Sequence, residues 1–149
     1  MDHVRYIEKH LLKASYKKNG VYNNTQILSR GKILNTRVVG GNYEEQCVNY
    51  LKQHGFQIAA QNYKCKIGEI DIIAVKNNIL RFIEVKYRKN EFFGFPIEAV
   101  NKRKQNKIMK TALWFLGENK EYENMQCSFD VISITENDVE YLFNCFGAM

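Results

Sequence analysis

Residues 68–87, GEIDIIAVKNNILRFIEVKY, decide how this chain folds. Apolar residues dominate both halves of the stretch, and the pair Asn77-Asn78 separates them. Asparagine tolerates the positive φ angles that a tight hairpin turn requires. The stretch therefore predicts two antiparallel strands, 69–76 and 79–87, joined by a two-residue turn. Their near-continuous apolar character is typical of strands that are covered on both faces.

The register of this predicted hairpin places two carboxylates opposite each other. If Asn77 and Asn78 form the turn, counting outward from it puts Asp71 directly opposite Glu84. Directly opposed side chains share a face, with Cβ atoms about 4.5–5.5 Å apart. Lys86 lies on that face too, because side chains alternate along a strand. Opposed like charges are destabilising unless a cation or a proton lies between them.

Two carboxylates and a lysine in this arrangement suit metal-assisted hydrolysis. Mg²⁺ binds oxygen atoms from one or two carboxylates and completes its shell with water and phosphate. A lysine beside the metal can orient or deprotonate a water, because the neighbouring cation depresses the lysine pKa. Metal, water and lysine together suit attack on a phosphodiester. The competing interpretation is a solvent-exposed strand face, on which Lys86 forms a surface salt bridge with Glu69 or Glu84.

Outside the hairpin, the flanking segments predict a mixed α/β domain. The remaining elements are, in chain order, a helix over 42–55, a strand over 56–63, a helix over 96–116, and strands over 128–135 and 139–143. Asn42 and Glu45 resemble a capping pair at the start of the first helix, and Pro96 suits the start of the second. We therefore expect an α-β-β-β-α-β-β order and a mixed sheet, with the long helix as the crossover connection.

The first forty residues are predicted to lie apart from this domain. Residues 4–16 place their apolar side chains on one stripe, which predicts an amphipathic helix. Residues 21–41 show no periodicity and contain three glycines, which is typical of a linker or an arm. A chain of 149 residues fits one ordinary domain. The predicted organisation is an N-terminal helix and linker over 1–40, followed by one folded domain over 41–149.

The composition favours a polyanionic partner. Lys and Arg number 22 against 16 Asp and Glu, and the resulting net charge of +6 suits nucleic acid or an anionic membrane surface. No apolar run approaches the roughly 20 residues of a membrane span, so an integral membrane protein is excluded. The N-terminus lacks the apolar core of a signal peptide, so a cytoplasmic location is expected. The four cysteines form no CxxC pair, which argues against a structural zinc site.

Positive charge is concentrated on the long predicted helix and just after the hairpin. The residues of this candidate nucleic-acid surface are Arg88, Lys102, Arg103, Lys104, Gln105 and Lys107. Their spacing suits contact with a phosphate backbone, although a solvated helix face would look the same. The aromatic loop 92–95 could stack on bases, or belong to the core or a dimer interface.

The ordered set of motifs resembles the core of the PD-(D/E)xK nuclease superfamily. Residues 68–71 followed by 82–86 carry this resemblance, and with Glu44 and 128–131 the sequence is more closely similar to the YraN-like family. That family is endonuclease-like by prediction and related in fold to archaeal Holliday junction resolvases. Over residues 41–146, the resemblance implies a restriction endonuclease-like αβββαβ core with a mixed central sheet, preceded here by an N-terminal helical extension.

The resemblance also implies roles for particular residues. Asp71 and Glu84 match the superfamily's metal ligands, and Lys86 matches its catalytic lysine. Glu44 is similar to an acidic residue that approaches the same metal. The implied cofactor is Mg²⁺ or Mn²⁺, and the implied reaction is hydrolysis of phosphodiester bonds in DNA, with branched or damaged DNA as one class of target. Ile70 departs from the proline in the motif's name.

Three functions stay open on the sequence alone. The first is a metal-dependent DNA endonuclease, the second a non-catalytic nucleic-acid-binding module of the same fold, and the third an RNA-directed nuclease. A homodimer is also expected, because two active sites are needed to cut both strands of a symmetric branched DNA. The candidate interface segments are the loop 92–95, the end of the chain over 142–146 and the stripe over 4–11.

Overall fold

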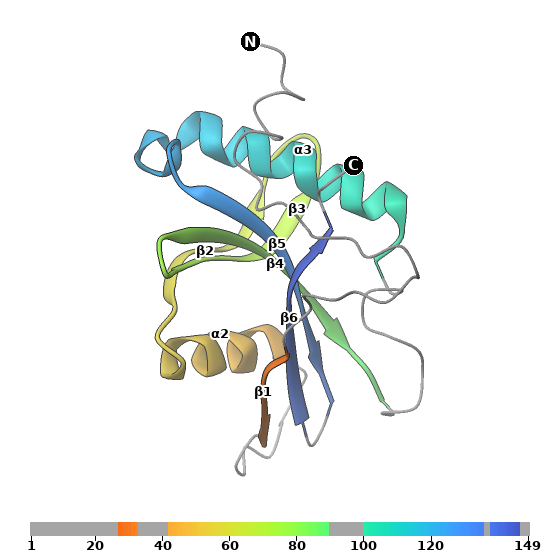
Figure 1. The fold of residues 1–149 in the computed structure, drawn as a ribbon. Helices are drawn as coiled ribbons and strands as arrows, with labels where there is room; N and C mark the ends of the chain where they lie inside the picture. The colour runs from red at the N-terminus through yellow and green to blue at the C-terminus, as the bar shows by residue number, and fades with distance from the viewer. Residues whose placement is uncertain (1–26, 33–41, 90–99, 136–137, 147–149) are drawn as a thin grey trace, which may run out of the picture.

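The computed structural model describes residues 27–32, 42–89, 100–135 and 138–146. Within these ranges, six strands form one mixed sheet, and helices α2 and α3 lie on its opposite faces (Figure 1). The elements are β1 (Ile27–Lys32), α2 (Tyr43–Gln53), β2 (Gln57–Lys64), β3 (Glu69–Lys76), β4 (Ile79–Tyr87), α3 (Lys102–Glu118), the 3₁₀ helix η2 (Lys120–Tyr122), β5 (Gln126–Ile134) and β6 (Asp138–Phe146). The order across the sheet is β1-β6-β5-β4-β3-β2.

The direction of the strands confirms the mixed α/β class. β4 and β5 run parallel, and the other neighbouring pairs are antiparallel. Parallel neighbours need a crossover connection, and α3 lies between β4 and β5 in the chain, as predicted. None of the helices among the described residues is long and apolar enough to cross a membrane.

The β3–β4 hairpin has the predicted register. Asn77 and Asn78 form the turn with φ angles of 54° and 59°, which belong to the left-handed region. The residues on either side of the turn pair with each other, and the ladder continues in the same register to the pair Ile72–Ile83. The next position along β3 is Asp71, so the ladder ends where the predicted site begins.

Both faces of the sheet are covered, which explains the apolar sequence of its central strands. In β5 every residue after Gln126 is buried. α3 contributes Ile108 and Phe115 to the apolar layer on one face. α2 contributes Val48 and Leu51 to the layer on the other face. The core therefore consists of two layers with the sheet between them.

Two predicted boundaries are wrong for local reasons. α3 begins at Lys102 rather than Pro96, because the side chain of Asn101 caps it by accepting a hydrogen bond from the backbone N–H of Lys104 at 2.9 Å. α3 also continues through Gly117 instead of ending there. The predicted capping pair of α2 is confirmed, since Asn42 accepts a hydrogen bond from the backbone N–H of Glu45.

Residues 27–32 form a strand, although the sequence predicts a linker there. β1 pairs antiparallel with β6 at the edge of the sheet, and its register shifts between Ile27 and Arg30. An irregular edge strand is held by its partner's backbone, so its own sequence need not alternate. The predicted helix over 4–16 and the loop 92–95 lie outside the described residues.

Two residues of one predicted dimer segment are buried in the core. Leu142 and Phe146 on β6 are 6% and 5% exposed, and both pack in the layer that α3 covers. Their apolar character therefore serves the core. The homodimer itself stays a prediction.

Gly68 lies close to α3, and its lack of a side chain allows this approach. A Cβ on Gly68 would lie 3.2 Å from Oγ1 of Thr111, and Thr111 is fully buried, so it has little room to move aside. We expect Gly68→Ala to lower the free energy of unfolding by about 1–3 kcal/mol, as overpacking does elsewhere. Urea denaturation followed by circular dichroism measures this loss.

Gly117→Ala is the matched control, because a Cβ there meets no atom within 4 Å. This second variant should be neutral or slightly more stable than the wild type, since alanine favours helix more than glycine does. Equal unfolding midpoints for the two variants would contradict the role given to Gly68.

Candidate functional site

The candidate site lies where the β3–β4 ladder ends. Asp71 follows the Ile72–Ile83 pair, and its Oδ2 accepts a hydrogen bond from the backbone N–H of Val85 at 2.8 Å. Val85 is the residue after Glu84, so this bond fixes the Asp71 carboxylate beside the part of β4 that carries Glu84. The hairpin register thus brings together the two carboxylates that the sequence predicts as a pair.

The two carboxylate oxygens of Glu84 have different surroundings. Oε1 lies 3.0 Å from Nζ of Lys86 and 3.3 Å from Nζ of Lys104. Oε2 is buried and has no hydrogen-bond partner among the described residues. The side chain as a whole is 4% exposed. A buried carboxylate oxygen without a partner is costly, and a bound cation would satisfy it.

Asp71 has a strongly raised pKa. Burial and the charge of Glu84 raise it from 3.8 to about 7, and Glu44 adds to this rise. The backbone N–H of Val85 and the ammonium group of Lys104 act in the opposite direction. Burial beside Glu84 therefore favours the protonated form of the Asp71 carboxyl group. A divalent cation would remove the cause of the shift, because it favours the charged form of both carboxylates.

β2 is distorted beside Asp71. Asn62 lies between the β2 residues that pair with Ile70 and Ile72, and so stands next to Asp71 in the sheet. Its φ of 49° belongs to the left-handed region, which asparagine adopts more readily than most residues. Backbone in such conformations is concentrated at functional sites. The distortion therefore marks the same place in the sheet as the two carboxylates.

Glu44 lies at the margin of the site, on the first turn of α2. Its charge raises the pKa of Asp71, and burial with the charges of Asp71 and Glu44 raises the pKa of Cys47 to about 12. Glu44 also lines a polar hollow of about 290 Å³ between α2 and β2, whose lining includes neither Asp71 nor Glu84. Within the described ranges, no three His, Cys, Asp or Glu side chains form a cluster that could hold a metal ion. A third protein ligand from Glu44 stays a prediction.

The residues predicted to bind nucleic acid fall into different places. Lys104 belongs to the carboxylate site through its contact with Glu84, a role that the sequence did not indicate. Gln105 donates from Nε2 to the carbonyl of Val100 at 2.8 Å, so its side chain supports the start of α3. Arg88 is half-buried just beyond β4. The remaining predicted residues, Lys102, Arg103 and Lys107, are exposed on α3.

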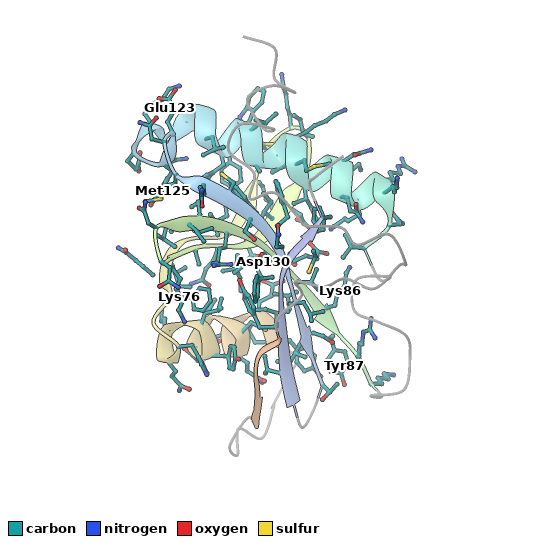
Figure 2. All side chains as sticks on the ribbon, viewed as in Figure 1. Lys76, Lys86, Tyr87, Glu123, Met125 and Asp130 are labelled. Carbon is teal, nitrogen blue, oxygen red and sulfur yellow. The ribbon has the colours of Figure 1, made fainter. Side chains whose placement is uncertain are left out.

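Sequence reasoning missed a buried polar cluster around Asp130. This side chain is fully buried near the middle of the sheet (Figure 2). Its Oδ2 accepts hydrogen bonds from Nη1 of Arg81 at 3.1 Å and from the Tyr141 hydroxyl. Its Oδ1 accepts from the Ser128 hydroxyl and from the backbone N–H of Asn144 at 2.8 Å. The available signal was the presence of polar residues within otherwise apolar strands.

This Asp130 cluster is separate from the carboxylate site. Arg81 and Glu84 differ by an odd number of positions on β4, so their side chains lie on opposite faces of the sheet. Tyr141 packs in the layer under α2, whereas Lys104 reaches Glu84 from α3. Figure 2 shows Lys86 near the far end of β4 and Asp130 close to the middle of the sheet. The cluster therefore stabilises the sheet and does not join the candidate site.

The family model described as "Uncharacterised protein family UPF0102" matches residues 43–134 of the chain. The chain belongs to the UPF0102 family. This membership confirms the YraN-like resemblance found in the sequence. The matched range contains the whole of α2, the β3–β4 hairpin, α3 and β5.

Relatives in the UPF0102 family are similar over most of their length. The chain is 43% identical over 115 residues to a UPF0102 protein of Lachnoclostridium phytofermentans, which covers 77% of this chain and 98% of the relative. It is 41% identical over 111 residues to a UPF0102 protein of Fusobacterium nucleatum, which covers 74% of this chain and 92% of the relative. The domain that carries the candidate site is thus nearly the whole of these two relatives.

Proposed function

We propose that this UPF0102 protein is a metal-dependent, endonuclease-like phosphodiester hydrolase that acts on DNA. Its site would be of the PD-(D/E)xK type, on a restriction endonuclease-like core, with Asp71, Glu84 and Lys86 as the central residues. The observation that carries the proposal is the buried Glu84 carboxylate beside Asp71. One Glu84 oxygen contacts two ammonium groups, while the other has no partner among the described residues.

The donor set fits a hard divalent cation. Asp71 and Glu84 would hold Mg²⁺ or Mn²⁺, because such ions take oxygen ligands from one or two carboxylates and fill the remaining positions with water and phosphate. Glu44 would approach the same ion from α2. When bound, the cation supplies Lewis-acid activation of the scissile phosphate and of a water. The raised pKa of Asp71 supports this assignment, since burial and the charge of Glu84 disfavour its charged form and a bound cation would favour that form.

Lys86 is the residue best placed to handle the attacking water. Its Nζ is held 3.0 Å from Glu84 Oε1, and the side chain is 29% exposed, so it reaches solvent while its position stays fixed. In this position Lys86 would orient the water and stabilise the charge that develops on the phosphate. Lys104 holds the same Glu84 oxygen from α3, and so it fixes the carboxylate from a second element.

A non-catalytic nucleic-acid-binding module is the second candidate function. The observation in its favour is that Lys102, Arg103 and Lys107 are exposed on α3, where they could contact a phosphate backbone without a metal. Such a module would keep the exposed basic residues of α3 and use the carboxylates only for folding. A homodimer would serve either function, and for the hydrolase it would supply one site for each strand.

Incubation of the full chain with a substrate panel tests the proposal. The panel holds duplex, flap and four-way-junction DNA and matching RNA, each with Mg²⁺, Mn²⁺ or EDTA. We expect metal-dependent cleavage of at least one DNA substrate. Asp71→Asn and Glu84→Gln should each slow it by about 100-fold or more, the range seen when one preorganised electrostatic group is removed.

Glu69→Gln is the control for these two variants. Glu69 lies on the same strand as Asp71 but is exposed, with a surface contact to Lys64 at 3.4 Å, so its replacement should leave cleavage unchanged. Metal-independent binding without cleavage of any substrate would replace the hydrolase by the binding module. Cleavage confined to RNA would change the target class and keep the chemistry.

A further inference from the structure

A line of exposed side chains on α3 leads away from the candidate site. Arg103, Lys107, Lys110 and Trp114 follow one another at spacings of four, three and four residues, which places them along one side of the helix. All four are exposed. Trp114 is 38% exposed, and no other large hydrophobic side chain within the described ranges is exposed. The line therefore begins with positive charge and ends on an aromatic ring.

Trp114 lines an open groove of about 710 Å³ at the C-terminal end of α3. Leu113 and Leu116 of the same helix, and Ile67 from the β2–β3 connection, give the groove a mainly apolar wall. Figure 2 shows Glu123, another lining residue, at the opposite end of α3 from Lys86. The groove is thus a surface separate from the carboxylate site, and α3 connects the two.

The indole ring of Trp114 is held in place by polar neighbours. Its Nε1–H donates to Oε1 of Glu118 at 3.2 Å, and Oε2 of Glu118 accepts a hydrogen bond from the Tyr63 hydroxyl at 2.6 Å. The ammonium group of Lys66 lies over one face of the ring, 4.5 Å from its centre. An exposed tryptophan that is fixed in this way provides a rigid stacking surface, because little side-chain entropy remains to be lost on binding.

We propose that this groove is a subsite for an unpaired nucleotide of the nucleic-acid substrate. The base would stack on Trp114, and the phosphates that follow it would run over Lys110, Lys107 and Arg103 toward the carboxylate site. Aromatic side chains beside a positively charged track are the combination that binds single-stranded nucleic acid. The inference rests on the proposed function and narrows its substrates to those with a single-stranded segment near the cut.

The charges around the groove favour a base over a phosphate as its occupant. Glu118 and Glu123 line the groove together with Lys110 and Lys120, so acidic and basic groups balance there. A neutral, flat base suits such a wall, whereas a phosphate suits the basic line nearer the helix start. A paired base is enclosed within its duplex and cannot present a face to the indole. The subsite therefore selects unpaired nucleotides.

The length of α3 sets the distance between the subsite and the cut. Lys104 and Trp114 are ten residues apart, which corresponds to about 15 Å along a helix at about 1.5 Å per residue. Neighbouring phosphates of one strand are about 3.4 Å apart along a duplex axis and further apart in an extended single strand, so this span covers at most about four to five nucleotides. We therefore expect flaps and junctions with unpaired nucleotides at this distance to be preferred over continuous duplex.

The single tryptophan of the sequence makes the test direct. Titration of the full chain in EDTA with single-stranded oligo-dT, and with duplex of equal length, follows Trp114 fluorescence while no metal-dependent cleavage can occur. We expect quenching by the single strand and little change with the duplex. An unchanged signal with single-stranded DNA would overturn the subsite. Competition by RNA of the same length would show whether binding at the subsite depends on the base alone or also on the deoxyribose.

Variants of Trp114 separate the contribution of base stacking from the electrostatic attraction between the phosphates and the basic residues of α3. Anisotropy of a labelled oligonucleotide should show about 5- to 150-fold weaker single-strand binding by Trp114→Ala, the range expected from loss of one base stack. Trp114→Phe should recover most of this loss, and circular dichroism should confirm that both variants are folded. Equal affinities for the three proteins would also overturn the subsite.

These measurements test the proposed subsite and the proposed hydrolase activity separately. Single-strand quenching by a wild-type chain that cuts no substrate would retain the subsite and remove the nuclease. Metal-dependent cleavage with identical KM values for the wild type and Trp114→Ala on a flap substrate would retain the nuclease and remove the subsite. A rise in KM at unchanged kcat in the alanine variant would support both.

Discussion

Asp130→Ala is expected to lower the free energy of unfolding by about 3–5 kcal/mol, which is a large fraction of the stability of a domain of this size. The carboxylate is fully buried and accepts hydrogen bonds from Arg81, Ser128, Tyr141 and a backbone N–H. Its removal leaves the buried guanidinium group without a counter-charge and two hydroxyl groups without an acceptor. Each of these losses adds to the cost.

Urea denaturation at neutral pH measures this loss. Asp130→Asn is a second variant in case the alanine variant does not fold. It keeps the shape of the side chain and one acceptor oxygen, so we expect a smaller loss in the free energy of unfolding. Adding Arg81→Met to the asparagine variant should recover stability, because it removes the orphaned charge. The exposed pair of Lys64 and Glu69 is the control, and Glu69→Ala should change stability by less than about 1 kcal/mol. Similar losses for the buried and exposed pairs would contradict the prediction.

The hairpin and its carboxylates could be predicted because their determinants are local. Asn77 and Asn78 both accept the φ angles of a two-residue turn, and a turn of known length fixes the register of the strands beside it. Asp71 and Glu84 then fall opposite each other by counting alone. A one-residue change in the loop would have moved one of them to the other face of the sheet.

The residue roles that could not be predicted depend on contacts between segments that are distant in the sequence. Lys104 meets Glu84 only because packing of α3 on the sheet sets the position of the helix, and no local pattern contains that position. Arg81 and Asp130 meet across the parallel β4–β5 pair, and Tyr141 joins them from β6. Such partners follow from the order of strands in the sheet, which local periodicity does not specify.

A similar cause explains the errors at the element boundaries. β1 is a strand because β6 offers it an edge, and its short irregular sequence carries no alternation of its own. At the start of α3 two local signals competed. Pro96 is favourable at a first helical turn, but Asn101 offers a side-chain acceptor to the free N–H groups of the helix, and the observed cap uses that acceptor.

Stability and the candidate chemistry make opposite demands at Asp71. The Asp130 carboxylate has donors on both oxygens, whereas Asp71 has a raised pKa because it is buried close to Glu84. A bound cation would favour the charged form of two carboxylates buried this close together, and the raised pKa of Asp71 can be measured as a dependence of stability on pH.

Asp71→Asn is expected to stabilise the metal-free protein, and the gain should grow with pH. The ordinary pKa of 3.8 applies in the unfolded chain, and the value in the folded protein is about 7. Below the lower value both states hold the proton, and the full stability is present. As the pH rises between the two values, the unfolded state ionises while the folded state keeps its proton. The wild type therefore loses about 1.4 kcal/mol of stability per pH unit until the folded carboxyl also ionises.

Guanidinium denaturation at pH 5, 6, 7 and 8 in EDTA measures this difference. The free energy of unfolding of Asp71→Asn minus that of the wild type should increase over this window and approach about 4 kcal/mol at pH 8. Glu69→Gln, on the same strand but exposed, should show a small difference that does not change with pH.

At pH 8 Mg²⁺ should raise the unfolding midpoint of the wild type and have little effect on Asp71→Asn, because the folded state alone presents both carboxylates to the ion. A difference that is constant from pH 5 to pH 8 would show that Asp71 ionises normally in the folded protein, and the argument for a cation between it and Glu84 would then lose its electrostatic basis.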